Sequence, residues 1–215
     1  NIKDMLNLTE LRKDYNKETI DVNTFNANPM YQFNTWFQQA IDVKIDEPNA
    51  MVLSTVNSLG KPSSRVVLLK HTEAEGFIFF TNYLSRKGQD IEKNTSVSLL
   101  FFWKELERQV RIEGLVEKKS LELASEYFKS RPYKSQIAAV ISPQSQEIPN
   151  RAFLDQKMSE LENLIEPITC PEHWGGYIIK PEYMEFWQGR ANRLHDRIAY
   201  IKNSDLSWRI TRLAP

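Results

Sequence analysis

The residues best suited to chemistry stand between Glu185 and Arg197, in the segment EFWQGRANRLHDR. It holds three arginines, a histidine and an aspartate behind a Phe-Trp pair, in a chain with only three histidines. Arginine forks bind phosphates through paired hydrogen bonds, and aromatic rings pack on planar groups. These residues therefore suit one wall of a site for an anionic aromatic ligand. A solvated charged turn between two strands is the alternative interpretation.

A second candidate is the segment TNYLSRKGQD, in which Ser85 is a typical helix N-cap. The free N–H groups of a first helical turn, together with Arg86 and Lys87, suit a phosphate. Basic residues at this end oppose the helix dipole, so a bound anion would relieve a local conflict. A solvated turn explains the same residues without a ligand.

Hydroxyl and basic groups also gather near Arg131. Tyr127 and Arg131 are four residues apart and share a face of a predicted helix. Pro132 then stops the helix, which lets Ser135 lie beside them. This cluster suits a phosphate, although an ordinary helix end has the same composition.

Three further segments carry weaker signals. In SSRVVLLK, Arg65 and Lys70 flank four apolar residues and point to opposite faces unless a bulge intervenes; charged strand ends in solvent are the alternative. Gln109 has the parity of the wet face of its strand, so it is either a ligand contact or a surface residue. In SPQSQ, Gln144 and Ser145 are hydrogen-bonding groups in what is otherwise a polar loop.

Several function classes lack their motif. The sequence has no G-x-G-x-x-G, P-loop, G-x-S-x-G or helical histidine pair, so dinucleotide, triphosphate, hydrolase and zincin sites have no motif support. With 28 basic and 28 acidic residues, the net charge is zero, which disfavours non-specific nucleic-acid binding. Cys170 is the single cysteine and lacks partners at metal-ligand spacing. The longest apolar run, 97–103, is too short to span a bilayer. We therefore expect a cytoplasmic protein with no metal, membrane or nucleic-acid partner.

The scaffold that positions these candidates is predicted to be mainly β. Asn28 and Pro29 begin a helix with one apolar face, and Ser85 and Ser120 begin two more. Because helices do not alternate regularly with strands, we expect one domain over 1–215: an antiparallel barrel with helices around it. The predicted strands cover 50–56, 63–71, 77–82, 96–103, 107–118, 175–181, 183–189, 197–203 and 208–215, and the later helices cover 120–131 and 151–165.

Together these fragments resemble the pyridoxamine (pyridoxine) 5′-phosphate oxidase family. The resemblance runs through LRKDY, AMVLSTV, RVVLLK, FFTN, SRKG, LERQVRIEG, EYFKSRP, SPQSQ, EFWQG, RLHDR and RLAP, in the family's order and over nearly the whole chain. RLHDR followed by RLAP is the most specific combination. The resemblance implies a Greek-key split β-barrel (α+β) that binds FMN at the interface of a homodimer, with both chains contributing to each site.

The resemblance also implies a role for individual residues. Catalysis is expected of Arg193 and His195, and residues 1–25 are expected to form an N-terminal lid segment. The expected flavin contacts are Arg65, Val66, Val67, Leu68, Lys70, Phe80, Thr81, Arg86, Lys87, Gln109, Gln144, Ser145, Trp187 and Arg197. The expected substrate contacts are Lys70, Tyr127, Arg131, Ser135, Arg193, His195, Arg12 and Tyr15.

The activity that the resemblance implies is oxidation of pyridoxamine or pyridoxine 5′-phosphate to pyridoxal 5′-phosphate, with dioxygen reduced to hydrogen peroxide. Two anionic ligands would explain scattered basic residues in a neutral chain. The rivals are a non-catalytic split-barrel protein that carries flavin or pyridoxal phosphate, and a flavin reductase on the same fold. A bare flavin carrier needs no second phosphate site, so the group around Arg131 argues against it.

Overall fold

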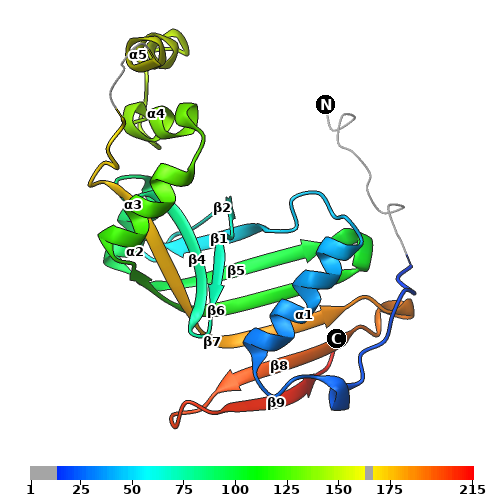
Figure 1. Cartoon of the computed structure of the whole chain (residues 1–215). Coiled ribbons are helices and arrows are strands. Elements are labelled where there is room, and N and C mark those ends of the chain that lie inside the picture. The colour runs from blue at the N-terminus through cyan, green and yellow to red at the C-terminus, as the bar shows by residue number, and fades with distance from the viewer. Residues whose placement is uncertain (1–13, 163–166) are drawn as a thin grey trace, which may run out of the picture.

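A computed structural model describes residues 14–162 and 167–215. Within these ranges, one antiparallel sheet runs in the order β2-β1-β5-β6-β7-β4-β3, with β8 paired to β7 and β9 paired to β8 (Figure 1). Its strands are β1 (Ala50–Val56), β2 (Pro62–Leu68), β3 (His71–Glu73), β4 (Gly76–Asn82), β5 (Ser96–Trp103), β6 (Arg108–Lys118), β7 (Trp174–Gln188), β8 (Asp196–Lys202) and β9 (Trp208–Leu213).

Strand β7 is the branch point of this sheet. Its first half pairs with β4, its second half pairs with β8, and β6 follows it along almost its whole length. The sheet therefore divides and curls into a split barrel, as the family resemblance implied. The expectation of two separate strands around Pro181 is wrong. The register between β6 and β7 shifts between Glu113 and Gly114, where β7 holds one extra residue, Glu182, and pairing continues past Pro181.

Helices begin where their caps predict. The side chains of Asn28, Ser85 and Ser120 accept hydrogen bonds from the first turns of α1, α2 and α3. A further helix, α4, was not expected after Pro132, yet proline is well tolerated just before a first turn. The helices are α1 (Pro29–Asp42), α2 (Arg86–Lys93), α3 (Leu121–Ser130), α4 (Tyr133–Ile141) and α5 (Ala152–Glu162), with 3-10 turns η2 (Val22–Thr24), η3 (Lys104–Leu106) and η4 (Ala191–Arg193).

The core lies between α1 and the sheet, which α1 crosses in Figure 1. Phe33 is fully buried, with its ring 4.8 Å from that of Phe77 and 5.1 Å from that of Phe101. Trp36, one turn further along, packs edge-on against Phe186 at 5.2 Å. These contacts join α1 to strands β4, β5 and β7 and stabilise the curl of the sheet.

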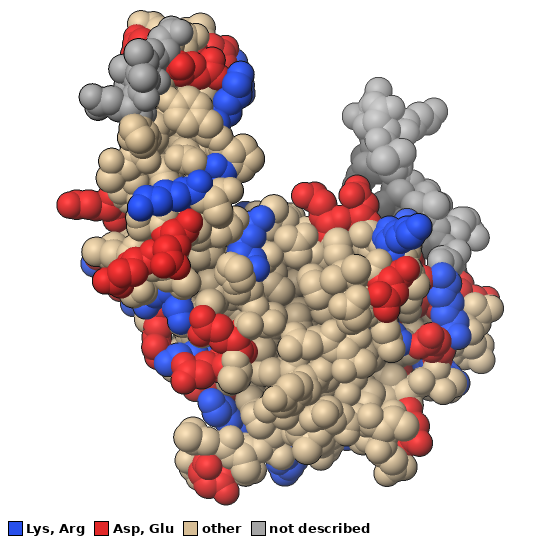
Figure 2. All heavy atoms as spheres, viewed as in Figure 1, with Lys and Arg blue, Asp and Glu red and all other residues tan. Residues whose placement is uncertain are grey.

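Helices α3, α4 and α5 extend away from one end of the sheet (Figure 1). On the face shown in Figure 2, the middle is largely uncharged, and acidic and basic side chains are mixed around its edge. In the described part of the chain, no helix combines the length and apolarity needed to cross a membrane.

Candidate functional site

A cavity of about 600 Å³ opens between the sheet and the small residues of α4. Strands β2 and β4, helices α2 and α3, and the start of β7 supply the other walls. Much of the predicted site meets here: the lining includes Val66, Val67, Leu68, Lys70, Phe80, Thr81, Lys87, Tyr127, Arg131, Ser135 and Gln144.

Lys87 is the buried cation of this cavity, with 8% of its surface exposed. Its ammonium group donates to Thr81 Oγ1 at 3.1 Å, Ser85 Oγ at 3.1 Å and Gln144 Oε1 at 3.3 Å. All three acceptors are neutral. Burial, with a smaller contribution from the charge of Arg65, lowers the pKa of Lys87 to about 8. A bound anion would therefore stabilise the charged form of this lysine.

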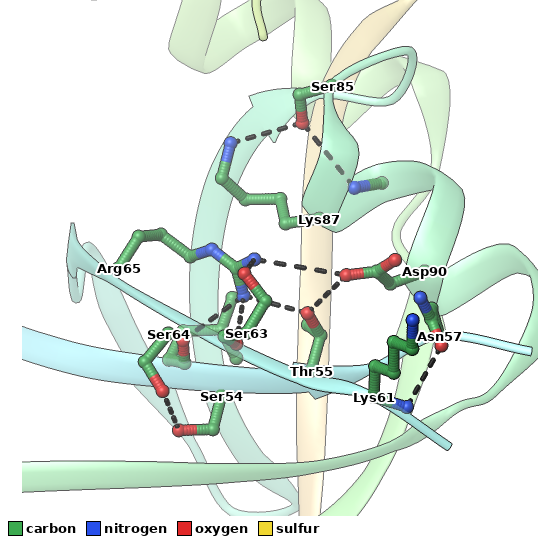
Figure 3. Close-up of polar contacts among 12 residues, drawn as sticks. Ser54, Thr55, Asn57, Lys61, Ser63, Ser64, Arg65, Ser85, Lys87 and Asp90 are labelled. Carbon is green, nitrogen blue, oxygen red and sulfur yellow. Dashed lines mark hydrogen bonds and ion pairs between the residues drawn. The ribbon is translucent and has the colours of Figure 1, made fainter. Parts of the chain in front are cut away.

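Arg65 does not line the cavity but supports the strands beneath Lys87 (Figure 3). It donates to Thr55 Oγ1 at 2.8 Å and to the Ser63 carbonyl at 2.9 Å, and lies 3.8 Å from Asp90. Its face is opposite to that of Val66, as the strand period requires. Lys70 reaches the cavity because β2 ends at Leu68, before the alternation reaches it. Arg86 is exposed and is not in the lining.

Arg131 carries the clearest sign of an anion-binding site. Its Nη1 atom is buried and has no hydrogen-bond partner among the described residues. The guanidinium group lies 4.8 Å from the ring centre of Trp174, an arrangement typical of a cation–π contact. Burial lowers the pKa of Arg131, and Tyr127 and then Cys170 partly offset this effect. Because an unpaired buried N–H is costly, the site favours an anion at this position.

An aromatic stack forms the floor of the same cavity. The rings of Phe80 and Tyr127 are 4.0 Å apart and nearly parallel, and Phe80 also stacks on Trp174 at 5.5 Å. Trp174 was not predicted from the sequence. It precedes the Gly175-Gly176 pair at the start of β7, and a lone aromatic there carried no visible functional signal. Only the packing of α3 on β7 makes it part of the site.

A second group of predicted residues lies outside the cavity lining. The rings of Trp187 and His195 are 4.7 Å apart, and Tyr15 meets them edge-on at 5.7 and 5.8 Å. Asn192 and Arg193 both have positive φ, 56° and 60°, in the turn between β7 and β8. Such backbone strain is concentrated at functional sites. Arg12 lies outside the described residues.

His195 is held in one orientation by this turn. The Arg190 backbone N–H donates to His195 Nδ1 at 3.1 Å, so the neutral ring carries its proton on Nε2. Burial and, to a lesser extent, the charge of Arg193 lower the pKa of His195. The structure therefore favours a neutral imidazole that can donate a hydrogen bond.

Arg197 is anchored by a buried carboxylate. Glu185, 2% exposed, accepts from Arg197 Nε at 2.9 Å and from Nη2 at 3.0 Å. Arg197 Nη1 donates to the carbonyl of Ala214, a residue of the RLAP motif, at 2.8 Å. Burial alone would raise the pKa of Glu185, but hydrogen bonds from Arg197 and Tyr183 and the arginine charges lower it. Arg197 keeps two N–H groups for another acceptor.

The register of the sheet places more of this second group together. Gln109 pairs with Trp187 across β6 and β7, and Trp187 pairs with Arg197 across β7 and β8. Directly paired side chains share a face, so these three form one row. Ser145, in the loop after α4, has φ of 71° and is exposed beside Gln144. We call Trp187, Arg193, His195 and Arg197 the wall group, and Lys87, Tyr127, Arg131 and Ser135 the cavity group.

Family models match both parts of the chain. Residues 37–164 match "Pyridoxamine 5'-phosphate oxidase", and residues 174–215 match "Pyridoxine 5'-phosphate oxidase C-terminal dimerisation region". The chain belongs to the pyridoxamine 5′-phosphate oxidase family. The second match covers all four residues of the wall group, whereas the first covers the cavity group.

Relatives in this oxidase family align with this chain over nearly its whole length. A pyridoxine/pyridoxamine 5′-phosphate oxidase of Paraburkholderia phytofirmans is 50% identical over 98% of this chain and 100% of its own length. One from Leptospira interrogans is 48% identical over 97% of this chain and 98% of its own length.

Two solved structures share the fold. PhzG from Burkholderia lata, solved in complex with tetrahydrophenazine-1-carboxylic acid, has a TM-score of 0.89 at 28% identity and covers 94% of this chain and 100% of its own. An FMN-binding protein of Nostoc punctiforme, related to pyridoxamine 5′-phosphate oxidase, has a TM-score of 0.72 at 13% identity, over 89% of this chain and 100% of its own.

Proposed function

We propose that the protein oxidises pyridoxamine 5′-phosphate and pyridoxine 5′-phosphate to pyridoxal 5′-phosphate, with FMN as cofactor and dioxygen as electron acceptor. One observation carries the proposal: among the described residues, the cavity holds a buried Arg131 N–H that has no hydrogen-bond partner and a buried Lys87 whose hydrogen-bond acceptors are all neutral. About half of the aligned residues are identical to those of relatives named for this reaction, which supports the choice of substrate.

The residues present fit both ligands. A volume of about 600 Å³ is within the roughly 300–1,000 Å³ of small-molecule sites. Lys87 lies in the first turn of α2, where an FMN phosphate would meet N–H groups and a cation, and Thr81, near the end of β4, accepts a hydrogen bond from its ammonium group. Arg131, with Tyr127 and Ser135, would hold the substrate's phosphate at the other side. This division requires two separate anion sites, which a simple flavin carrier does not need.

The wall group is proposed to come from a partner copy of the chain. Phe102, Gln109, Trp187 and Arg197 are cross-strand partners on one face of the sheet. Phe102 is 52% exposed and Val66, at the cavity, is 65% exposed, which leaves apolar surface uncovered in one chain. The match of 174–215 to a dimerisation region supports pairing of two copies over this face.

Within the wall group, Arg193 and His195 would then act on the ring of the substrate, and Trp187 and Arg197 would face the flavin. Arg193 is proposed to position the pyridine ring and to stabilise charge that develops on it. His195 would donate from Nε2, because the Arg190 N–H occupies Nδ1. When bound, FMN would supply the two-electron acceptor for oxidation of the substrate's 4′ carbon, with dioxygen as the final electron acceptor. The amine consumes dioxygen and water and yields the aldehyde, ammonia and hydrogen peroxide; the alcohol consumes dioxygen alone and yields no ammonia.

The test is an anaerobic absorbance titration of the FMN-loaded protein with pyridoxamine 5′-phosphate, followed by air. We expect the oxidised flavin band to bleach and to return as peroxide and pyridoxal 5′-phosphate form. A flavin band that neither the amine nor the alcohol phosphate bleaches would replace the proposal with the carrier function. Bleaching by a nicotinamide nucleotide alone would indicate a flavin reductase.

A further inference from the structure

The chain segment from Tyr15 to Ile20 lies across the ends of β6 and β7, next to the wall group. Tyr15 is the residue of this segment that touches Trp187 and His195. The segment has no helix or strand of its own over these residues. Its position must therefore depend on contacts with the barrel.

Glu107 binds the two residues that follow Tyr15 in the chain. Its carboxylate oxygen Oε2 accepts from the backbone N–H groups of Asn16 at 3.0 Å and Lys17 at 3.2 Å. The side chain is almost fully buried, with 1% of the residue exposed. Two consecutive N–H groups on one carboxylate form a charge-assisted clasp that fixes the backbone directly after Tyr15.

The same residue also fixes the end of β7. The Glu107 carbonyl accepts from the Gly189 N–H at 2.7 Å and from Gln188 Nε2 at 3.3 Å. Glu107 has a φ of 52°, a left-handed conformation that turns its carbonyl and its side chain to these different partners. One residue thus sets both the Tyr15 segment and the strand that carries Trp187.

Gly189 supplies the surface on which Tyr15 rests. A Cβ atom at Gly189 would lie 2.7 Å from Tyr15 Cγ and 2.8 Å from Tyr15 Cβ, closer than non-bonded carbons approach. The tyrosine therefore packs directly on the glycine backbone. Any larger residue would move the ring away from Trp187 and His195.

We propose that Glu107 and Gly189 are positioning residues that seat Tyr15 over the wall group, and that this seat tightens binding of the aromatic phosphate substrate. The substrate part rests on the proposed function; the seat itself does not. Further along the segment, Ile20 N–H donates to Asp196 Oδ2 at 3.2 Å and Arg190 donates to the Glu18 carbonyl at 3.2 Å. Because these anchors remain when Glu107 is changed, only residues 14–17 should be released.

Hydrogen exchange of the purified protein tests the seat without an activity assay. In Glu107→Ala we expect the amides of Asn16 and Lys17 to exchange about tenfold faster or more, since both lose a charge-assisted bond. Glu107→Gln keeps an acceptor and should give a smaller increase. Glu105→Gln is the matched control, because the exposed Glu105 side chain lies in the same turn; its exchange pattern should equal that of the wild type.

Two results would overturn the seat. The first is unchanged exchange at Asn16 and Lys17 in Glu107→Ala. The second is faster exchange throughout β6 and β7, which would assign Glu107 to the barrel. If Glu107→Ala does not fold, Glu107→Gln and Gly189→Ala still decide, since Gly189→Ala should release the same amides.

Steady-state kinetics test the link to substrate. In Gly189→Ala we expect the KM for pyridoxamine 5′-phosphate to rise several-fold while the Kd for FMN stays unchanged. An unchanged KM despite released amides would refute the substrate effect. If the wild-type protein lacks oxidase activity but the variants change hydrogen exchange as expected, the proposed function is refuted and the seat of Tyr15 is not.

Discussion

At the scale of single residues, Lys87 is expected to couple the binding of an anion to pH. Its pKa is lowered to about 8 by burial, so the ligand-free site loses this charge above that pH. An anion stabilises the ammonium form, so the pKa must be higher in the complex. We expect FMN affinity to be constant below about pH 8 and to fall by up to about tenfold per pH unit above it.

Fluorescence titrations of FMN from about pH 7 to about pH 9.5 would measure this slope. Lys87→Met should bind FMN more weakly and lose the pH dependence that the wild type shows over this range. Lys61→Met is the control, because Lys61 is exposed in the turn before β2. A wild-type affinity that does not change across pH 8 would contradict the assignment of Lys87 to an anion.

At the scale of elements, Glu185 ties three strands together. It accepts from Arg111 of β6 at 3.2 Å, Tyr183 of β7 at 2.8 Å and Arg197 of β8. Removal of one member of a buried ion pair leaves its partners unpaired. Since Arg197 is partly exposed, we expect Glu185→Ala to lower the free energy of unfolding by about 2 kcal/mol.

Urea unfolding would measure the loss, and Glu113→Ala provides the comparison. Glu113 binds the same Arg111 at 2.7 Å, but its side chain is 50% exposed. An exposed ion pair contributes less than about 1 kcal/mol. Equal destabilisation by the two variants would show that burial of the carboxylate is not what matters.

The elements also show what the sequence could predict. The helix starts at Asn28, Ser85 and Ser120 were predictable because a cap is a local hydrogen bond within a few residues. The continuity of β7 past Pro181 was not, because it depends on a register shift in the pairing of β7 with β6, a strand more than sixty residues earlier. Helix α4 was missed because proline was treated only as a stop signal.

The residues of the candidate site also divide into those that the sequence predicted and those that it did not. Arg131 and Lys87 were predicted from residue types and a family resemblance, and both line the cavity. Trp174 and Glu107 were missed. Trp174 matters through its contacts with α3, and Glu107 through bonds to backbone groups 90 and 91 residues away, and neither relation leaves a local pattern.

At the scale of the whole molecule, the cavity group and the wall group are expected to meet across two chains. None of the four wall residues is in the cavity lining of its own chain. In a dimer with two-fold symmetry, each of two sites would combine the cavity of one copy with the wall of the other. Residues of the two groups should then complement each other between chains.

Mixed dimers of Arg131→Ala and Arg193→Ala make this measurable. Each variant alone should be nearly inactive at substrate far below KM. In a mixed dimer, one site carries both defects and the other carries neither. Random reassembly makes half of the dimers mixed, so co-refolded protein should recover about a quarter of wild-type activity. Proteins mixed without subunit exchange are the control. If each site were built from one chain, every site in the mixture would keep one defect and no activity would return.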